Sequence, residues 1–140
     1  MNIDTLLTAL ASKITGSAFS DGVVGRVWLD SSLPNPEYPY VLYQVISGSP
    51  NDTFAEDLED VSVQFSIFST SSSAAEIAAI YNNLETLFDD CVLTISGSVN
   101  IWTIRESFGT ATYDIEATPT GTATVKQWDV DYSILVQKTA

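Results

Sequence analysis

The stretch VSVQFSIFSTSSSAAEIAAIYNNLETLF, residues 61–88, joins two hydrophobic patterns that have different periods. In its first part, Val61, Val63, Phe65 and Ile67 alternate with polar residues, which predicts a strand with one buried face. After a run of serines, the apolar residues recur at intervals of three and four, which predicts an amphipathic helix. The apolar residues of this helix are Ile77, Ile80, Tyr81, Leu84, Leu87 and Phe88. We therefore expect a strand whose following helix packs back across the sheet.

Two details refine this unit. Phe68 interrupts the polar row of the strand, so we expect the second face of the sheet to be covered near that end. Ser73 stands three residues before Glu76, a spacing typical of a capping box, in which each side chain binds the backbone N–H of the other residue. We expect the helix to begin near Ser73.

The rest of the chain predicts one more helix and several strands. Apolar residues at helical spacing predict a first helix over residues 3–14, ended by Gly16. The Thr- and Gly-rich residues 108–123 leave their length and register open. Strands are predicted by runs of β-branched and aromatic residues over residues 23–29, 40–46, 92–95, 99–104 and 128–136.

This order of helix, three strands, helix and about three further strands is typical of an α+β fold. We expect a mixed, mostly antiparallel sheet with two helices packed on one face. The chain has 140 residues, which is long enough to bury a core and short for two typical domains. We therefore expect residues 1–140 to form a single domain.

The charge balance excludes one class of partner. Eighteen Asp and Glu residues stand against five Lys and Arg residues, which gives a formal net charge of −13. Binding DNA or RNA requires cations that neutralise phosphates, and five scattered cations cannot form such a surface. The same balance argues against binding to anionic membranes, and no apolar run reaches the roughly 18 residues that span a bilayer. We expect neither nucleic-acid binding nor membrane attachment.

The sequence carries no recognisable catalytic or metal-binding pattern. It has no histidine, which removes Ser-His-Asp and Cys-His systems and imidazole metal sites. The single cysteine, Cys91, has no neighbouring cation in the sequence to stabilise a thiolate. No phosphate-binding glycine pattern is present, and the acidic residues cluster in predicted loops rather than in apolar surroundings. We expect a protein that is not an enzyme and uses no cofactor or metal.

Two sets of residues are candidates for contacts with other proteins. Residues 47–60 are predicted to form a long hairpin connection, and unstructured loops of this length are often functional. Asp89 and Asp90 end the second helix, where negative charge opposes the helix dipole. They either stay solvated or pair with a cation of a neighbouring subunit. Arg26 and Arg105 are either ordinary surface cations or the partners in such intersubunit ion pairs.

Several segments occur in an order that is known from one family. They are the N-terminal helix, VGRVW at 24–28, YPYVL at 38–42, VSVQFSIF at 61–68 and the helix after it. This order resembles the tail terminator proteins of long-tailed bacteriophages, also called tail completion or head–tail joining proteins. The resemblance covers residues 3–95, and the β-rich C-terminal third is compatible with it. Residues 107–123 depart from the shorter family members and are expected to form an additional hairpin or arm.

The resemblance implies a structural protein of the virion, assembled in the cytoplasm of the bacterial host. It implies a homo-oligomeric ring, usually a hexamer, which ends polymerisation of the tail-tube protein and joins the tail to the head connector or stopper protein. DNA would pass through the lumen without specific binding, and acidic side chains there would repel its backbone. Residues 47–60 would then be a docking loop that orders on contact. Its contact residues would be Phe54, Glu56, Asp57, Leu58, Glu59 and Asp60.

Two other interpretations remain open. One is another ring of the same neck, either a head-completion stopper or a tail-tube protein, although tube proteins are mostly β and would not carry so strong a helix over residues 73–88. The other is a small acidic binding module or a hydrolase of unrecognised type. Deletion of the 47–60 loop separates these interpretations, because a terminator would fold and then fail to join heads to tails.

Overall fold

The alternating strand and the amphipathic helix are both present, within an α+β fold that has more helices and longer strands than expected. The computed structural model describes residues 3–29, 37–50, 57–118 and 121–139. Its helices are α1 (Ile3–Ile14), α2 (Ala18–Asp21) and α3 (Ala75–Phe88). Its strands are β1 (Val27–Leu29), β2 (Tyr40–Pro50), β3 (Leu58–Ser69), β4 (Thr94–Ile95), β5 (Ser98–Thr118) and β6 (Gly121–Lys138).

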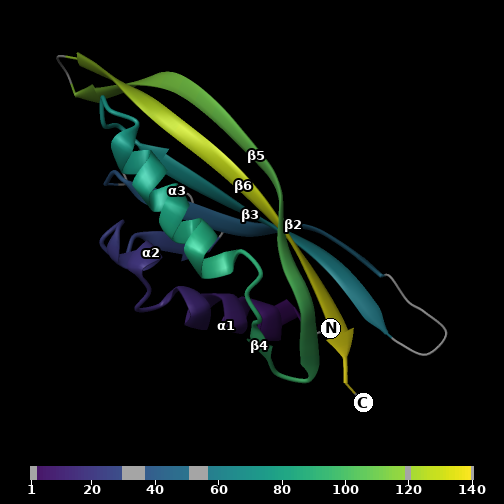
Figure 1. Ribbon diagram of the computed structural model, residues 1–140. Helices are drawn as coiled ribbons and strands as arrows, with labels where there is room; N and C mark the ends of the chain where they lie inside the picture. The colour runs from purple at the N-terminus through teal and green to yellow at the C-terminus, as the bar shows by residue number, and fades with distance from the viewer. Residues whose placement is uncertain (1–2, 30–36, 51–56, 119–120, 140) are drawn as a thin grey trace.

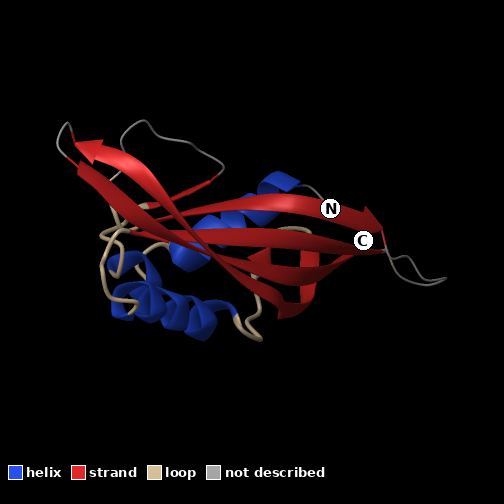
Figure 2. Ribbon diagram, turned by 90° about the horizontal axis from the view of Figure 1, so that it is seen from above, coloured by secondary structure: helices blue, strands red, loops and turns tan. Residues whose placement is uncertain are grey.

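All six strands belong to one mixed sheet in the order β1-β2-β3-β6-β5-β4. Only β1 and β2 are parallel, and every other neighbouring pair is antiparallel. The sheet is strongly twisted, and its two long hairpins, β2–β3 and β5–β6, point to opposite ends (Figures 1 and 2). Right-handed twist of this kind follows from the stereochemistry of extended L-residues.

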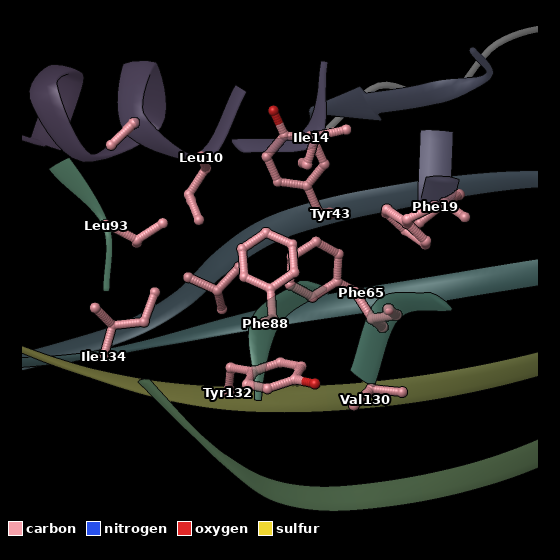
Figure 3. Packing of buried hydrophobic residues seen from close by; sticks show 14 of the residues in the cluster. Leu10, Ile14, Phe19, Tyr43, Phe65, Phe88, Leu93, Val130, Tyr132 and Ile134 are labelled. Atoms are coloured by element: carbon pink, nitrogen blue, oxygen red, sulfur yellow. The ribbon is translucent and has the colours of Figure 1, made fainter. Parts of the chain in front are cut away.

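The alternation in β3 is confirmed by burial. Val61, Val63, Phe65 and Ile67 are each at most 1% exposed, whereas the polar residues between them are half-buried. The four apolar side chains join one core cluster with residues of α1, α2, α3, β2 and β6 (Figure 3). The ring of Phe65 lies at its centre, with four aromatic neighbours at centroid distances from 4.9 to 6.2 Å. They are Phe19, Tyr43, Phe88 and Tyr132.

The expected cover on the second face of the sheet is also present. Phe68 stacks on Tyr40 at a centroid distance of 4.7 Å, and both rings belong to a smaller cluster with buried Val125. Burial raises the pKa of the Tyr40 hydroxyl to about 12. This cluster lies at the end of β2 and β3 that is farthest from their hairpin connection.

The prediction of two helices on one face is wrong, because three helices contribute to the core. The additional helix α2 lies between the predicted first helix and the predicted strand over residues 23–29. Its N-cap is Ser17, whose hydroxyl oxygen accepts a hydrogen bond from the backbone N–H of Ser20 at 3.1 Å. Phe19, which is 1% exposed, anchors the turn in the core. A helix of four residues is too short to produce a periodic sequence pattern.

The start of α3 also differs from the prediction. The helix begins at Ala75 after an Ala74 N-cap that makes no side-chain cap hydrogen bond. The carboxylate of Glu76 accepts a hydrogen bond from the Ser69 hydroxyl at 2.7 Å and so does not form a capping box. Ser73 still helps, since its hydroxyl oxygen accepts from the N–H of Ala75 at 3.1 Å. Glu76 thus binds Ser69 at the end of β3 in place of the expected backbone N–H of Ser73.

Strand β1 is shorter than predicted. The chain turns at Val24 and Gly25, which have φ values of 54° and 72°, so pairing starts only at Val27. Positive φ is costly for a β-branched residue such as valine. The turn is closed by the N–H of Arg26, which donates to the carbonyl of Val23 at 3.0 Å.

Candidate assembly surface along strand β5

Strand β5 runs along a border of the sheet, and its outer edge is covered over only a short part. Its inner edge pairs with β6 over nearly its whole length, whereas β4 pairs with it only at Ser98 and Val99. The chain before β4 covers the next part, since the N–H of Asp90 donates to the carbonyl of Thr103 at 3.0 Å. From Ile104 onward, no strand in the described part of the chain pairs with this edge. An open edge of this kind is a template for pairing with another strand.

The same strand carries many of the exposed apolar side chains. Among the described residues, 11 large hydrophobic side chains are exposed, and six of them belong to β5. These six are Val99, Ile101, Trp102, Ile104, Phe108 and Tyr113. Covering them with another chain would remove apolar surface from water, which favours association. Strand β5 is therefore the described surface best suited to a protein contact.

Beyond β3, strands β5 and β6 continue as a two-stranded arm. The pairing between β3 and β6 ends at Ser69 and Lys126, while β5 and β6 remain paired as far as Thr118 and Gly121. The arm projects at the upper left of Figure 1, at the end of the sheet opposite the β2–β3 hairpin. This geometry confirms the expectation of an additional hairpin over residues 107–123. A two-stranded ribbon is only marginally stable in water by itself, so a further strand or surface would stabilise the arm.

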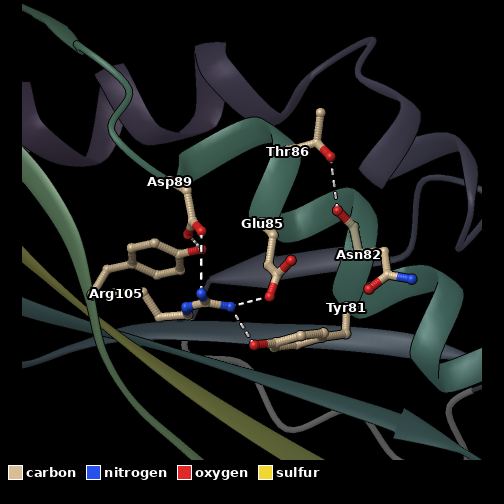
Figure 4. A network of polar contacts seen from close by, with 7 residues as sticks. Tyr81, Asn82, Glu85, Thr86, Asp89 and Arg105 are labelled. Carbon is tan, nitrogen blue, oxygen red and sulfur yellow. Dashed lines mark hydrogen bonds and ion pairs between the residues drawn. The ribbon is translucent and has the colours of Figure 1, made fainter.

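The guanidinium of Arg105 ties β5 to α3 (Figure 4). It donates hydrogen bonds to the Tyr81 hydroxyl and the Glu85 carboxylate, and it lies 3.4 Å from the Asp89 carboxylate. Hydrogen bonding with the Tyr81 hydroxyl, and then with Arg105, holds the pKa of the Glu85 carboxyl below its usual value. Phe108 extends this contact, since its ring lies 4.9 Å from that of Tyr81. One face of β5 is thus held against the helix while its edge stays open.

Of the residues predicted to form intersubunit ion pairs, Arg105 and Asp89 pair with each other inside the chain. Asp89 also accepts a hydrogen bond from the hydroxyl of fully buried Tyr132 at 2.6 Å. Asp90 is exposed and has a φ of 55°. Additional pairing of these charges across a subunit boundary stays a prediction.

Arg26, the fourth of these residues, binds the segment that leads into β2. Its Nε donates to the carbonyl of Pro39 at 2.9 Å, and a terminal nitrogen donates to the carbonyl of Tyr38 at 3.3 Å. The carboxylate of exposed Glu37 lies 3.5 Å away. In the described chain, Arg26 therefore holds the entry to β2.

The predicted docking loop over residues 47–60 is shorter than expected. Its two ends belong to the sheet, because β2 and β3 pair from Ser47 and Ser62 out to Pro50 and Glu59. Four of the six predicted contact residues are described: Asp57 next to the strand, and Leu58, Glu59 and Asp60 within β3. The other two, Phe54 and Glu56, lie outside the described residues. Strand propensity missed this extension because Gly48, Pro50 and the acidic residues are poor strand formers.

The face of the sheet that does not contact the main core carries carboxylates from two neighbouring strands. Asp60 of β3 accepts a hydrogen bond from the Ser133 hydroxyl at 2.7 Å, and Asp131 of β6 accepts one from the Ser107 hydroxyl at 2.9 Å. The second oxygen of Asp131 is buried without a hydrogen-bond partner among the described residues. Asp129 follows on the same face by alternation. We call this surface the acidic face.

Two cations of β5 and β6 point away from this face. Arg105 binds groups of α3, and the ammonium of Lys126 donates to the carbonyl of Ser71 in the loop before that helix. Within the described part of the chain, no three Cys, Asp or Glu side chains are grouped so that they could hold a metal ion. None of the described helices is long and apolar enough to cross a bilayer.

Sequence reasoning missed the second half of β5 and with it most of this surface. Residues 108–115 read FGTATYDI, and the β-branched and aromatic members favour a strand. Gly109 and Asp114 weakened that signal. In the structure, β6 extends back from Trp128 to Gly121 and pairs with this segment.

Comparisons with a family model and with solved structures place this fold among known proteins. The family model described as tail completion protein gp17 matches residues 4–137. A solved chain described as part of the virion of a native gene transfer agent particle is 13% identical, with a TM-score of 0.70, and the alignment covers 93% of this chain and 92% of that one. A second solved chain is 15% identical, with a TM-score of 0.58 and 96% of each chain covered. These two share the fold. Comparison with curated proteins gives no match.

Proposed function

Because this chain belongs to the tail completion protein gp17 family, we propose that it is a structural, non-enzymatic protein of a phage virion that completes the tail at its head-proximal end. In this proposal, a single domain assembles into a ring, most simply a hexamer, on the last ring of the tail-tube protein. The ring ends tube polymerisation and binds the head connector or stopper protein. It is assembled in the cytoplasm of the bacterial host.

The observation that carries this proposal is the open, apolar edge of β5. A monomer that stayed monomeric would be expected to blunt such an edge with charge, proline or a covering segment. Here the open edge is long, and three of the exposed apolar side chains, Ile104, Phe108 and Tyr113, lie on that part of the strand. An assembly protein has a use for both features, because each subunit must present a surface that other chains complete.

The acidic face supports the passage of DNA through the proposed ring. Asp60, Asp129 and Asp131 would repel the phosphate backbone if this face lined the lumen, since like charges meet there. The net charge of −13 adds to the same repulsion. DNA would then pass without being bound.

The tip of the β2–β3 hairpin is the proposed docking element for the tail tube or the connector. Asp57, Glu59 and Asp60 place three carboxylates at the base of this tip, and the hairpin points away from the β5–β6 arm (Figure 2). A partner that binds here would present complementary cations.

Deletion of residues 51–56 tests the proposal in an infected host. The deletion leaves the described pairs between β2 and β3 in place, so the protein should fold, while free heads and unjoined tails should accumulate in place of phage particles. A second variant replaces the same six residues with a Gly/Ser linker of equal length. This variant keeps the length of the connection and removes only the docking side chains. Purified protein should also cap isolated tail tubes in negative-stain images. Normal infectivity of both variants, together with uncapped tubes, would refute the proposed function.

A further inference from the structure

An apolar patch occupies the end of the acidic face that lies next to the β2–β3 hairpin. Trp102 of β5 pairs with Leu135 of β6, and Leu135 pairs with Asp60 of β3. Residues paired in this way share one face of the sheet, so Trp102 and Leu135 lie on the acidic face. Val99 and Ile104 share this face, because their partners in β6 are the second residues on either side of Leu135. We call Val99, Trp102, Ile104 and Leu135 the Trp102 patch.

A bulge in β5 shapes this patch. The register with β6 shifts between Asn100 and Trp102, so Ile101 is an additional residue in the strand. Asn100, which is 5% exposed, donates to the carbonyls of Trp102 at 2.8 Å and Leu135 at 3.2 Å. Its side-chain oxygen accepts from the hydroxyl of buried Thr103 at 3.0 Å. A buried side chain thus fixes the bulge, and exposed Ile101 and Trp102 follow each other directly.

The indole of Trp102 is held on the sheet by hydrogen bonds that end on a carboxylate. Its Nε1 donates to the hydroxyl oxygen of Ser133 at 3.4 Å, and that hydroxyl donates to Asp60 at 2.7 Å. The side chain nevertheless remains 40% exposed. An aromatic ring that is already oriented loses little conformational freedom on binding, which suits it to anchor a protein contact.

The charge around the patch is of one sign. Strands β2, β3, β5 and β6 contain three cations, and none of them shares the acidic face. Arg105 and Lys126 bind groups on the side of α3, and alternation in β6 places Lys138 on that side too. Asp60 and Asp131 lie on the acidic face, and one oxygen of Asp131 is buried without a hydrogen-bond partner among the described residues. A ligand that covers the patch therefore meets carboxylates without compensating cations.

We propose that the Trp102 patch binds a segment of another virion protein in which apolar side chains are flanked by Lys or Arg. The inference rests on the proposed function and deepens it, since it adds a surface of the sheet to the docking hairpin. The apolar side chains of the partner cover Trp102 and Ile104, and its cations face Asp60 and Asp131. A second copy of this chain is a poor occupant, because its net charge of −13 would meet the same carboxylates.

Photo-cross-linking in assembled particles tests this contact. The photoreactive amino acid p-benzoylphenylalanine replaces Ile104, which is 44% exposed, and leaves Trp102 and the carboxylates intact. The matched control carries it in place of Val24, which is 74% exposed in the turn before β1. Irradiated particles should contain a link from position 104 to a different protein, and mass spectrometry should place it among apolar residues that adjoin Lys or Arg. Position 24 should not reach that segment.

Binding of the linked segment, made as a synthetic peptide, to the full-length protein then tests the chemistry. Trp102→Ala should weaken binding by about 30-fold, as loss of an anchoring aromatic residue does at other protein contacts. Ile104→Ala, at a side chain that makes no hydrogen bond, should weaken it less and guards against a folding defect in the first variant. Asp60→Asn with Asp131→Asn keeps oxygen acceptors at both positions, and should weaken binding and flatten its dependence on salt. Val24→Ser is the control and should bind normally.

Three results would overturn the inference and leave the proposed function standing. A link from position 104 to another copy of this chain would show that the patch is a contact between subunits. A linked peptide whose binding is unchanged by the two Asp→Asn substitutions would show that the partner is not recognised by its cations. Particles that contain the protein but no link from position 104 would show that the patch stays open. If the protein is absent from particles, the proposed function fails and this inference falls with it.

Discussion

Removal of the Asp89 carboxylate tests how far the junction of β6, β5 and α3 stabilises the fold. The Tyr132 ring is fully buried, and its hydroxyl donates to Asp89 at 2.6 Å. In Asp89→Ala this hydroxyl loses its described acceptor, and Arg105 loses a carboxylate at 3.4 Å. An unsatisfied buried hydroxyl costs about 1–3 kcal/mol, and loss of a partly exposed ion pair adds about 0.2–1 kcal/mol. We expect the free energy of unfolding to fall by about 1–4 kcal/mol.

A double-mutant cycle separates the lost hydrogen bond from a general defect. Tyr132→Phe removes the hydroxyl and leaves Asp89 paired with Arg105, so it should cost only about 0.5–1.5 kcal/mol. The double variant leaves no orphaned hydroxyl, so its cost should be below the sum of the two by about 0.5–3 kcal/mol. Urea unfolding followed by circular dichroism measures each value, with Asp57→Ala as the control at an exposed carboxylate. Additive costs, or an Asp89→Ala variant as stable as the control, would refute the reasoning.

Three further predictions concern stability. Phe65→Ala should lower the free energy of unfolding by about 3–5 kcal/mol, because the ring is 1% exposed at the centre of the core. If thermal unfolding shows that this variant loses less stability than a substitution at an exposed position, the packing around Phe65 is contradicted. Gly25→Ala should lower the free energy of unfolding by about 1 kcal/mol, because alanine is strained at φ 72°. Gly109→Ala should be nearly neutral, because its added Cβ would have no neighbouring atom within 4 Å. Equal melting temperatures of the two variants would contradict the role of Gly25 in the turn. Burial, and then the hydrogen bond to Asp89, raise the pKa of Tyr132 above its ordinary 10.0. The contribution of neutral Tyr132 to stability is therefore complete below pH 10.0 and is lost as the pH rises above 10.0. The urea midpoint of the unmodified protein should record this loss, and the midpoint of Tyr132→Phe should not.

Patterns that repeat over many residues allowed most of the fold to be predicted. In β3 and α3, the apolar residues lie on one face whatever the neighbouring elements are, so period alone identified the strand, the helix and the buried side. The same holds for α1 and for the core half of β6. The family resemblance rested partly on these periodic segments and partly on residues 24–28 and 38–42, and the family match over residues 4–137 confirms it.

Features that depend on one or two contacts were not predicted. The capping box at Ser73 failed because Glu76 found Ser69 at the end of β3, a residue that is distant until the chain has folded back. Helix α2 depends on a single buried side chain, Phe19. Of the candidate ion-pair residues, Arg105 and Asp89 were identified by type, but their partners within the chain could be known only from the approach of β5 to α3.

By itself, the sequence determined the strand–helix unit, the acidic charge and the lack of a recognisable catalytic pattern, because each is a property of residue types at short spacing. Only the tertiary structure decided which strand lies at the border. Residues 104–118 would be unremarkable in the middle of a sheet, where neighbours on both sides would pair their backbone groups. Their place outside β6, with β4 covering only the first two residues of β5, leaves the edge open, since hydrogen bonds between strands depend on partners far apart in the sequence.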